Sequence, residues 1–535
     1  MSILISDIPT KEPYDEHVEI YDYNIPKRQF SHGNKLLKES FSELPPATSP
    51  SAAILSGISN SYVSFKLDKS IHYVKSAYLN FTISNTSATG CTTAVYTIVP
   101  TLDSTGAATA TAGGSLSIGI GRYGQTLPLA YNTTAANWQI AIRALDHSNS
   151  DLASITVAGT LDATGMTITL TGVRPYMDKY GPVYCASNSL VSAVPNHLMT
   201  VVTNSVAFSY GDTFLLTASP LLIQKIESFL GNQQLEKKTG EDSFIDIFSS
   251  EFDENELLTI CTKCLYINPE TLQSVAYIEA GGSLNFSIPI NNSIVTSNIP
   301  FGLLPNVNPE LKVYFSGGAA NILQTLTGSG AVIADVSLSN ISLTIGGTVL
   351  DRDEFARKKA SMDKIIHQGV DFRCLLATSV DLQGLTYVAG ATSTQVLNQN
   401  ADVSHMYIYS LPNTITAGEQ RYAFLELSDL NIVSQSQVGL MSGNQLPQRI
   451  IRVIACQKFQ SRVFEKLNVY ALSPSTEPLK DLERGEKWGG LKIYSSDCLK
   501  VNPAFSAAAH ISVLIYGFAT ICVYANGSVV IERSM

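Results

Sequence analysis

Charged residues are scarce in this sequence. Asp, Glu, Lys and Arg make up only 15% of its 535 residues, against about a quarter in a typical soluble domain. The 45 acidic residues outnumber the 35 basic ones, and the formal net charge is -10. Because a chain of that charge repels phosphate groups, we expect neither direct packaging nor sequence-specific binding of nucleic acid.

Cysteine is also sparse. Eight cysteines in 535 residues are too few for a disulfide scaffold, so we expect buried free thiols. Cys261 and Cys264 form one CxxC pair. A structural zinc site needs a second pair or histidines at suitable spacing. The sequence offers neither, so we predict no metal ion.

Long apolar runs are missing. The most apolar window, residues 511–525, contains Ser, Gly, Thr and two Tyr and is shorter than the roughly 20 residues that cross a membrane. We predict two buried strands there. Met1–Ile5 is followed at once by charged residues instead of the apolar core of a signal peptide. This predicts synthesis in the cytoplasm.

Catalytic signatures are absent as well. The chain has no GxxxxGK[ST], HExxH or GxSxG motif, and its eight histidines are isolated. Gly119, Gly121 and Gly124 spell GxGxxG, but Pro128 follows where a dinucleotide site requires a helix. We therefore predict no enzyme, no catalytic or cofactor-binding residue and no cofactor.

Two carboxylate pairs stand beside these absences. Glu236 with Glu241, and Asp351 with Asp353, are spaced so that they could serve a sandwich-fold glycosidase. Turn and helix-capping roles explain both pairs more simply.

Apolar residues, Ser, Thr and Asn are abundant. Hydrophobic residues make up 45% of the chain, enough for two or three cores at this length. Short runs of alternating polar and apolar residues, separated by Gly, Pro and Asn turns, predict antiparallel β-sandwiches. The predicted strands cover residues 61–67, 74–84, 213–223, 284–290, 311–315, 336–345, 405–409, 422–430, 450–456, 467–472, 491–494 and 511–531.

One helix is predicted, over Arg352–His367. Asp351 and Glu354 are spaced as a capping box, basic residues follow the acids, and Gly369 marks the end. The charge run predicts a solvated face. The expected buried stripe is Phe355, Met362, Ile365 and Ile366.

Residues 1–50 are interpreted as a polar arm. Six prolines between Pro9 and Pro50 interrupt any helix or strand. Acids and bases are mixed, so the arm is not a basic genome-binding tail. The alternative is a terminus without a role. The aromatic residues that would suit docking on a neighbour are Tyr14, Tyr21, Tyr23, Phe30 and Phe41.

Residues 88–172 are interpreted as an inserted α+β module, because their small-residue texture differs from both flanks. The predicted order is strand, strand, helix, strand, strand. The helix covers Thr133–Leu145, and the closing strands cover residues 154–157 and 166–170. The expected buried helix face is Trp138, Ile142 and Leu145.

An internal repeat is also suggested. Residues 226–237 align with residues 341–352 as an apolar strand, a small-residue turn, then Leu, an acid and a base. Without the arm and the insertion about 400 residues remain, which suits two sandwiches of about 200 residues each.

Both copies carry a resemblance to the double jelly-roll major capsid proteins of the tectivirus, adenovirus, virophage and large-DNA-virus lineage. Ile226–Glu236 resembles the family's first strand and turn, with Asn232 in place of a Gly and Glu236 in place of an Asp. Leu350–Arg357 and Ile365–Gln368 are similar to the helix that opens the second jelly roll. Residues 286–289, 301–305 and 311–315 resemble the family's proline-rich crossing that ends the first jelly roll.

The resemblance implies an all-β fold of two tandem antiparallel jelly rolls, residues 51–318 and 319–535, with the α+β module in the first. It implies a structural capsid protein of a DNA virus, whose homotrimers form pseudo-hexagonal capsomers of an icosahedral shell. Implied partners are neighbouring capsomers, minor capsid and penton proteins, and an internal membrane. The implied location is the virion, assembled in the host cell. A receptor- or glycan-binding spike and a polysaccharide-active enzyme stay open as alternatives.

Overall fold

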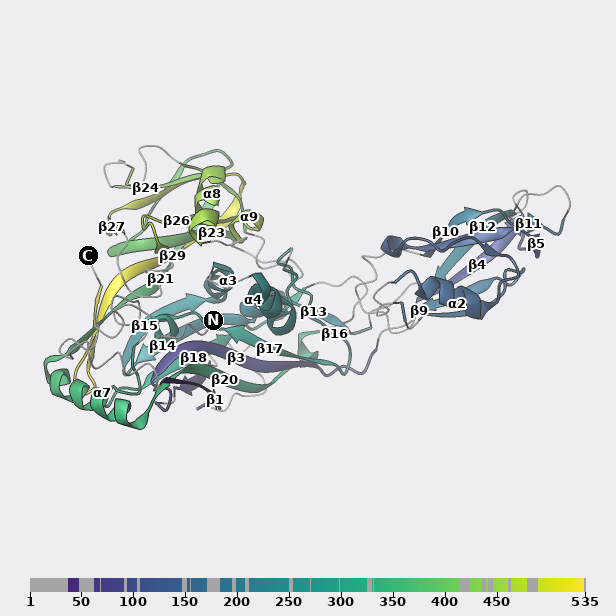
Figure 1. Ribbon diagram of the computed structural model, residues 1–535. Helices are drawn as coiled ribbons and strands as arrows, with labels where there is room; N and C mark the ends of the chain where they lie inside the picture. The colour runs from purple at the N-terminus through teal and green to yellow at the C-terminus, as the bar shows by residue number, and fades with distance from the viewer. Residues whose placement is uncertain are drawn as a thin grey trace, which may run out of the picture.

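Figure 1 shows the computed structural model of the chain as two stacked β-sandwiches and a third, separate body. The structure describes residues 37–47, 62–67, 69–90, 94–102, 106–146, 152–153, 155–170, 183–194, 199–206, 211–249, 254–269, 271–297, 299–324, 330, 332–413, 424–434, 439–440, 446–459, 463–478 and 489–533. Every strand pair among these residues is antiparallel, as predicted.

The first sandwich has two four-stranded sheets, ordered β1-β20-β3-β17 and β15-β14-β18-β2. Buried and exposed positions alternate along β3, which is why its sequence predicts a half-buried strand. A three-stranded sheet, β16-β13-β19, accompanies this sandwich. The strands are β1 (Leu37–Leu44), β2 (Tyr62–Lys66), β3 (Tyr73–Asn85), β13 (Phe214–Leu216), β14 (Ile223–Leu230), β15 (Gln233–Thr239), β16 (Tyr277–Ile278), β17 (Ser283–Pro289), β18 (Pro309–Phe315), β19 (Leu323–Gln324) and β20 (Val336–Leu350).

The second sandwich pairs a six-stranded sheet with a sheet ordered β22-β28-β24-β25. The six-stranded sheet has the order β21-β29-β23-β26, and in it β27 also pairs with β23 and β30 with β29. The apolar window at residues 511–525 lies mostly in one long strand, β29, so the prediction of two strands there is wrong. The strands are β21 (Val370–Tyr387), β22 (Ser393–Val396), β23 (Ala401–Pro412), β24 (Leu427–Val433), β25 (Leu446–Pro447), β26 (Val469–Leu472), β27 (Leu491–Ile493), β28 (Cys498–Pro503), β29 (Ala507–Val523) and β30 (Val529–Arg533).

The separate body on the right of Figure 1 is the inserted module, and it has a hydrophobic core of its own. Trp138 and Ile142 of helix α2 are buried in that core as predicted, and Leu145 packs against it. The strands β10 to β12 pair with β6, β5 and β4. We therefore propose that the module extends to Val206, beyond the predicted end at residue 172. Its elements are β4 (Ala94–Leu102), β5 (Thr111–Gly113), β6 (Ser115–Ile120), η4 (Gly121–Tyr123), β7 (Leu129–Ala130), α2 (Ala135–Arg143), β8 (Thr156–Gly159), β9 (Met166–Leu170), β10 (Val183–Asn188), β11 (Val191–Ser192) and β12 (Met199–Val206).

Helices occupy the connections. Helix α7 links β20 of the first sandwich to β21 of the second, and a strand predicted at residues 450–456 is helix α8 instead. The helices outside the module are η6 (Ser219–Leu222), α3 (Gly240–Ser249), α4 (Glu254–Thr259), the π-helical η7 (Ile260–Leu265), α5 (Ser293–Thr296), α6 (Ala319–Ile322), η8 (Ile333–Asp335), α7 (Arg352–Ile365), η9 (Ile366–Gln368), α8 (Gln448–Phe459) and α9 (Val463–Lys466). No helix in the described ranges is long and apolar enough to cross a membrane.

The predicted helix at residues 352–367 is confirmed as α7 continued by η9. Asp351 caps it by accepting a hydrogen bond from the Asp353 backbone N–H. Met362 and Ile366 are buried as expected. The charge run is not wholly solvated, because Glu354 and Lys358 are both buried, with Lys358 Nζ 3.9 Å from Glu354 Oε1.

The pairing of β20 bears on two predictions from the sequence, the internal repeat and the boundary between the sandwiches. Residues 226–230 and 341–350 lie in β14 and β20, which belong to opposite sheets of the same sandwich. The aligned segments are therefore not equivalent strands of two sandwiches, and the duplication argument fails. Since β20 pairs with β3 as far as Thr348, we propose that the first sandwich ends at Leu350, later than the predicted residue 318.

The predicted arm needs a correction too. Residues 37–44 form β1, which pairs with β20 along its whole length. This stretch lies between Pro26 and Pro45 and contains no proline, so nothing in it prevents strand pairing. Phe41 on β1 is 70% exposed. The remaining arm residues outside 37–47 lie beyond the described part of the chain.

Candidate functional site: the joint between the sandwiches

The sequence features that could suggest catalysis do not form a catalytic site among the described residues. The GxGxxG glycines lead from β6 into the short helix η4, and Gln125 then pairs back with Gly119. Cys261 is buried in η7, where burial raises the pKa of its thiol to about 12. No group of three or more His, Cys, Asp or Glu side chains in the described residues could hold a metal ion.

The strongest concentration of buried charge lies where the two sandwiches meet. Helix α3 is entirely buried, although it carries three acids. Figure 1 shows it between β14 and β15 below and β23 above. Burying charge is costly unless the groups pair and hydrogen-bond. The buried polar residues of this joint are Glu236, Lys238, Asp242, Asp246 and His405, with Tyr409 and Tyr516 beside them.

Lys238 is the cation of the joint. Its Nζ lies 2.8 Å from Asp246 Oδ2, 2.7 Å from the Asn291 carbonyl oxygen and 2.9 Å from the Tyr516 hydroxyl. Three donors thus meet three acceptors. Burial alone would lower the pKa of Lys238, but the carboxylates of Asp246 and Glu236 raise it above its usual value. The lysine therefore stays charged.

Tyr516 ties this cation to the second sandwich. It stands on β29, and its hydroxyl donates to Asp246 Oδ1 at 2.5 Å while it accepts from Lys238. The His405 ring on β23 stacks on the Tyr516 ring at 4.4 Å between centroids. Burial and the nearby Lys238 lower the pKa of His405 to about 3. The ring is neutral at physiological pH and acts as a packing surface.

Asp242 forms a second link. Its Oδ1 accepts from the Tyr409 hydroxyl of β23 at 2.8 Å, and its Oδ2 accepts from the Thr239 backbone N–H at 2.9 Å. Burial raises the pKa of Asp242 to about 6 despite these hydrogen bonds. The aspartate is thus a titrating group inside the joint.

Glu236 forms the third link. Its Oε2 accepts from the Ser293 N–H at the start of α5, at 2.7 Å, and its Oε1 accepts from the Ala377 N–H of β21, at 2.6 Å. Both β15 and β21 are edge strands of their sheets. The carboxylate therefore satisfies an edge N–H of the second sandwich from the edge of the first.

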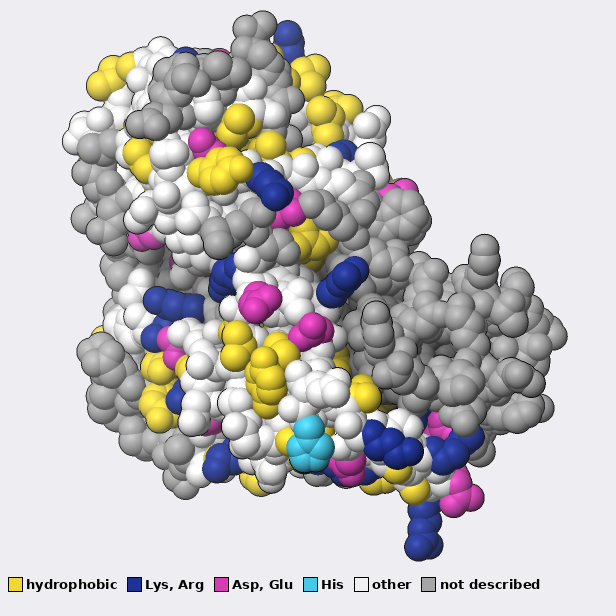
Figure 2. Space-filling view, turned by 90° about the vertical axis from the view of Figure 1, so that its left-hand side faces the viewer, with side chains coloured by type: hydrophobic (Ala, Val, Ile, Leu, Met, Phe, Trp, Pro, Cys, Tyr) yellow, Lys and Arg dark blue, Asp and Glu magenta, His cyan; other side chains and the backbone are white. Residues whose placement is uncertain are grey.

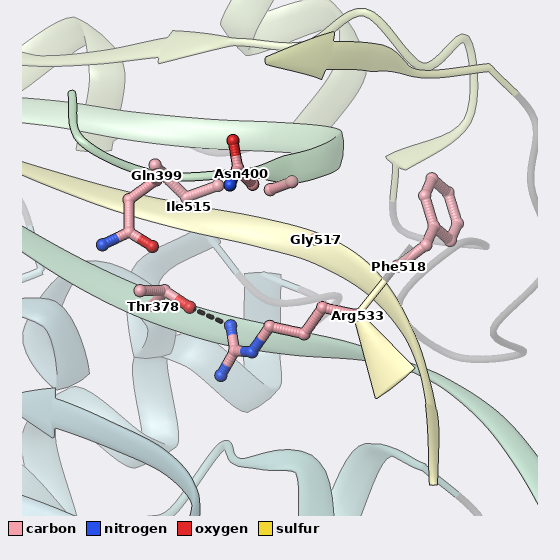
Figure 3. Close-up of a pocket in the computed structure, with 8 residues that line it drawn as sticks. Thr378, Gln399, Asn400, Ile515, Gly517, Phe518 and Arg533 are labelled. Carbon is pink, nitrogen blue, oxygen red and sulfur yellow. Dashed lines mark hydrogen bonds between the residues drawn. The ribbon is translucent and has the colours of Figure 1, made fainter. Parts of the chain in front are cut away.

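The cavity found in the described part of the joint is too small for a substrate. The cavity beside Glu236 and Lys238 has a volume of about 10 Å³, which holds about one water molecule. A hollow of the same size in the second sandwich is lined by Thr378, Asn400 and Arg533, and Arg533 donates to the Thr378 hydroxyl (Figure 3). The perturbed groups of the joint are arranged to hold two domains together.

A smaller polar contact fixes the start of α7. His72 Nδ1 accepts from the Leu350 N–H at 2.7 Å, and its ring stacks on Phe355 at 4.6 Å between centroids. Burial lowers the pKa of His72, so the neutral ring can accept that hydrogen bond. The link between the sandwiches is thereby anchored at its first turn.

Comparison with known proteins identifies the fold. No family model matches the chain, and no curated protein does. Among solved structures, PBCV-1 VP54, in a crystal structure fitted into a reconstruction of the virophage Sputnik, has a TM-score of 0.52 at 9% identity, over 93% of this chain and 97% of that one. The quasi-atomic model of the PBCV-1 virus capsid gives a TM-score of 0.50, with the same identity and coverage.

The fold is the double jelly roll of viral capsid proteins. The two sandwiches are thus the two jelly rolls, and the resemblance inferred from the sequence is confirmed at the level of the fold. Glu236, noted in the sequence as a departure from the family's Asp, proves to be a link between the rolls.

Sequence reasoning does not find the joint itself. It pairs Glu236 with Glu241 as carboxylates, and it does not single out Lys238 or Asp246. A signal is present, because Glu236 and Lys238 share one face of a strand and Asp242 and Asp246 share one face of the following helix. Asp351 has the predicted capping role.

Proposed function

We propose that the chain is a structural capsid protein, whose trimers form pseudo-hexagonal capsomers of an icosahedral virus shell. The observation that carries the proposal is the double jelly-roll fold, shared with a virus capsid over 93% of this chain. Two similar sandwiches held side by side let a three-fold oligomer present six similar contacts. No enzymatic step is proposed.

The joint supports this role mechanically. A capsid subunit must keep both sandwiches in one relative orientation while neighbouring subunits contact each of them. Buried hydrogen bonds between charged and polar groups fix orientation better than apolar packing alone, because each hydrogen bond has one geometry. Three such links connect α3 and β15 to β21, β23 and β29. The two rolls therefore act as one rigid tile.

The chemistry of the surface is also compatible with a capsid subunit. Figure 2 shows acidic, basic and small hydrophobic groups interspersed over one side of the two sandwiches. The spike and polysaccharide-enzyme alternatives find no support in the comparisons. The partners proposed for this chain are other copies of itself and minor capsid proteins, with an internal membrane beneath, and its proposed location is the virion.

Sedimentation velocity of the purified full chain tests the oligomer. Three chains of 57.7 kDa give a species of about 173 kDa, as closed three-fold symmetry requires. A chain that stays at 57.7 kDa at micromolar concentration, and never forms larger assemblies, would contradict the proposal.

A further inference from the structure

The two outer faces of the first sandwich differ in chemistry. At the centre of the β20-β3-β17 face, uncharged side chains bond across strands. Asn80 Nδ2 donates to Thr344 Oγ1 and Thr82 Oγ1 donates to Asn285 Oδ1, each at 2.8 Å. These uncharged groups satisfy one another, although Glu43 on β1 also presents its carboxylate to this face and accepts from Ser342 Oγ at 2.7 Å.

The outer face of the β15-β14-β18-β2 sheet is charged and aromatic. The strand register places Lys225 beside Tyr314, and Glu227 beside Lys312. Tyr62 pairs with Tyr314 on the far side. We call this surface the lysine face; it comprises Lys66, Lys225, Lys237, Lys312, Glu227, Glu310, Tyr62, Phe229 and Tyr314.

The lysine face is basic within an acidic chain. Four lysines stand against two glutamates, while the whole chain carries a formal net charge of -10. Lys66 and Lys237 are exposed, and Tyr62 is 39% exposed. The face is therefore open to solvent and attracts anionic groups.

Contacts within the face hold Lys225 and Lys312 in place. Lys225 Nζ lies 3.9 Å from the Tyr314 ring centroid and 2.7 Å from Glu227 Oε1. Lys312 Nζ lies 4.4 Å from the Phe229 ring centroid and 5.3 Å from that of Tyr62. Cation–π contacts of this kind position an ammonium group without neutralising it. Lys312 therefore keeps its charge available to a partner.

The chain contains a segment of complementary chemistry. Residues 7–23 hold six acids and one lysine, Lys11, together with Tyr14, Tyr21 and Tyr23. This segment lies outside the described residues. Tyrosines beside carboxylates suit a surface on which aromatic rings and lysines alternate.

The segment can reach the face. The chain enters the structure at Leu37 in β1, on the opposite sheet of the same sandwich. The 13 residues between Tyr23 and Leu37 can span about 45 Å when extended, whereas packed sheets lie only about 10 Å apart. Length therefore permits contact.

We propose that the acidic segment of residues 7–23 docks on the lysine face. Its carboxylates pair with Lys66, Lys225, Lys237 and Lys312, and its tyrosines pack beside Tyr62 and Phe229. The contact weakens as salt is raised, because pairs at the surface are screened.

Zero-length carbodiimide cross-linking of the full chain tests the contact, since it joins only carboxylates and amines already in contact. The expected products, mapped by mass spectrometry, are amides between Asp15, Glu16 or Glu19 and the four lysines of the face. They fall several-fold between 50 and 500 mM salt. Coupling of these acids only to lysines elsewhere on the chain would overturn the proposal.

Charge reversal supplies the matched control. The pair Lys225→Glu and Lys312→Glu should abolish cross-links to the remaining face lysines, and Lys492→Glu, an exposed lysine of the second sandwich, should change nothing. Reversing Asp15, Glu16 and Glu19 to Lys in the double variant should restore coupling, now between the lysines introduced in the segment and the acids introduced on the face. Failure of that rescue in a variant with an unchanged circular dichroism spectrum would contradict the contact.

This outcome is separable from the proposed function. A trimer that lacks these cross-links would contradict the docking contact and leave the capsid role standing. Cross-links in a chain that stays monomeric would support the docking contact and contradict the capsid role.

Discussion

At the scale of single residues, Glu236 does what no apolar side chain could do at its position. Two backbone N–H groups from different elements, those of Ser293 and Ala377, point at its carboxylate. A buried donor without an acceptor costs about 1–3 kcal/mol. The glutamate therefore stabilises the joint chiefly by preventing two such losses.

Replacing Glu236 by Ala should lower the free energy of unfolding by about 2–6 kcal/mol, since two buried donors lose their acceptor. Glu236→Gln keeps one acceptor oxygen and should cost about half as much. Urea unfolding followed by circular dichroism measures both free energies. The exposed Glu532→Gln is the control and should change stability by less than about 0.5 kcal/mol. Equal effects of all three substitutions would contradict the account.

Asp242 predicts an unusual pH dependence. Its pKa is raised from 3.8 to about 6 by burial, so the folded chain binds a proton that the unfolded chain has released. Stability therefore falls as pH rises from about 4 to about 6, and it stays at the lower level above that range. The acid faces Asp246 and Lys238 as well as Tyr409, but only its own titration is removed by Asp242→Asn.

The measurement is the difference in unfolding free energy between the wild type and Asp242→Asn at pH 4 and at pH 7. Between pH 4 and pH 7 the wild type should lose up to about 3 kcal/mol of unfolding free energy that Asp242→Asn keeps, which is the equivalent of two pKa units. Parallel pH profiles of the two proteins would show that Asp242 does not titrate in this range.

At the scale of elements, the sequence predicts what local chemistry decides. Asp351 caps the start of α7, and Gly369, whose φ is 91°, ends the η9 turn that continues it. The β-branched run of helix α8 imitates a strand, although Ile451, Ala455 and Phe459 recur at helical spacing and form its buried face. The pairing of β1 and β20 joins residues about 300 positions apart in sequence, which no local pattern reveals.

The joint escapes prediction for the same reason. Each of its polar residues has an ordinary local explanation, as a strand-face charge or a helix-start acid. Their burial depends on β21, β23 and β29, which follow more than 120 residues later in the sequence. Tertiary contact, rather than local preference, decides that these charges are internal.

We predict that the inserted module can be removed without destabilising the two sandwiches. Its core is separate from those of the sandwiches, so replacing residues 91–210 by a short Gly/Ser linker should leave their thermal unfolding midpoint unchanged. Excising only residues 88–172 should instead cause aggregation, because β10 to β12 lose their partners β4 to β6. Unfolding of the whole chain by the longer excision would show that the module belongs to the main core.

At the scale of the whole molecule, residues 1–36 and strand β1 are expected to contribute differently to stability. Deleting residues 1–36 removes the acidic segment that is proposed to dock on the lysine face, and should leave the fold and the trimer intact. Deleting residues 1–50 removes β1 as well and uncovers the edge of β20, so it should also lower stability. Light scattering for assembly and thermal unfolding for stability distinguish the two deletions. Identical behaviour of both would contradict the assignment of β1 to the sandwich.

The most direct test of the capsid role is cryo-electron microscopy of particles assembled from the full chain. The account predicts hexagonal capsomers of three copies each, in which six sandwiches ring a three-fold axis and each pair is joined through α3. Removing residues 91–210 should delete density from each copy without disturbing that ring. Capsomers built from any other number of copies, or sandwiches of one chain that separate from each other, would contradict it.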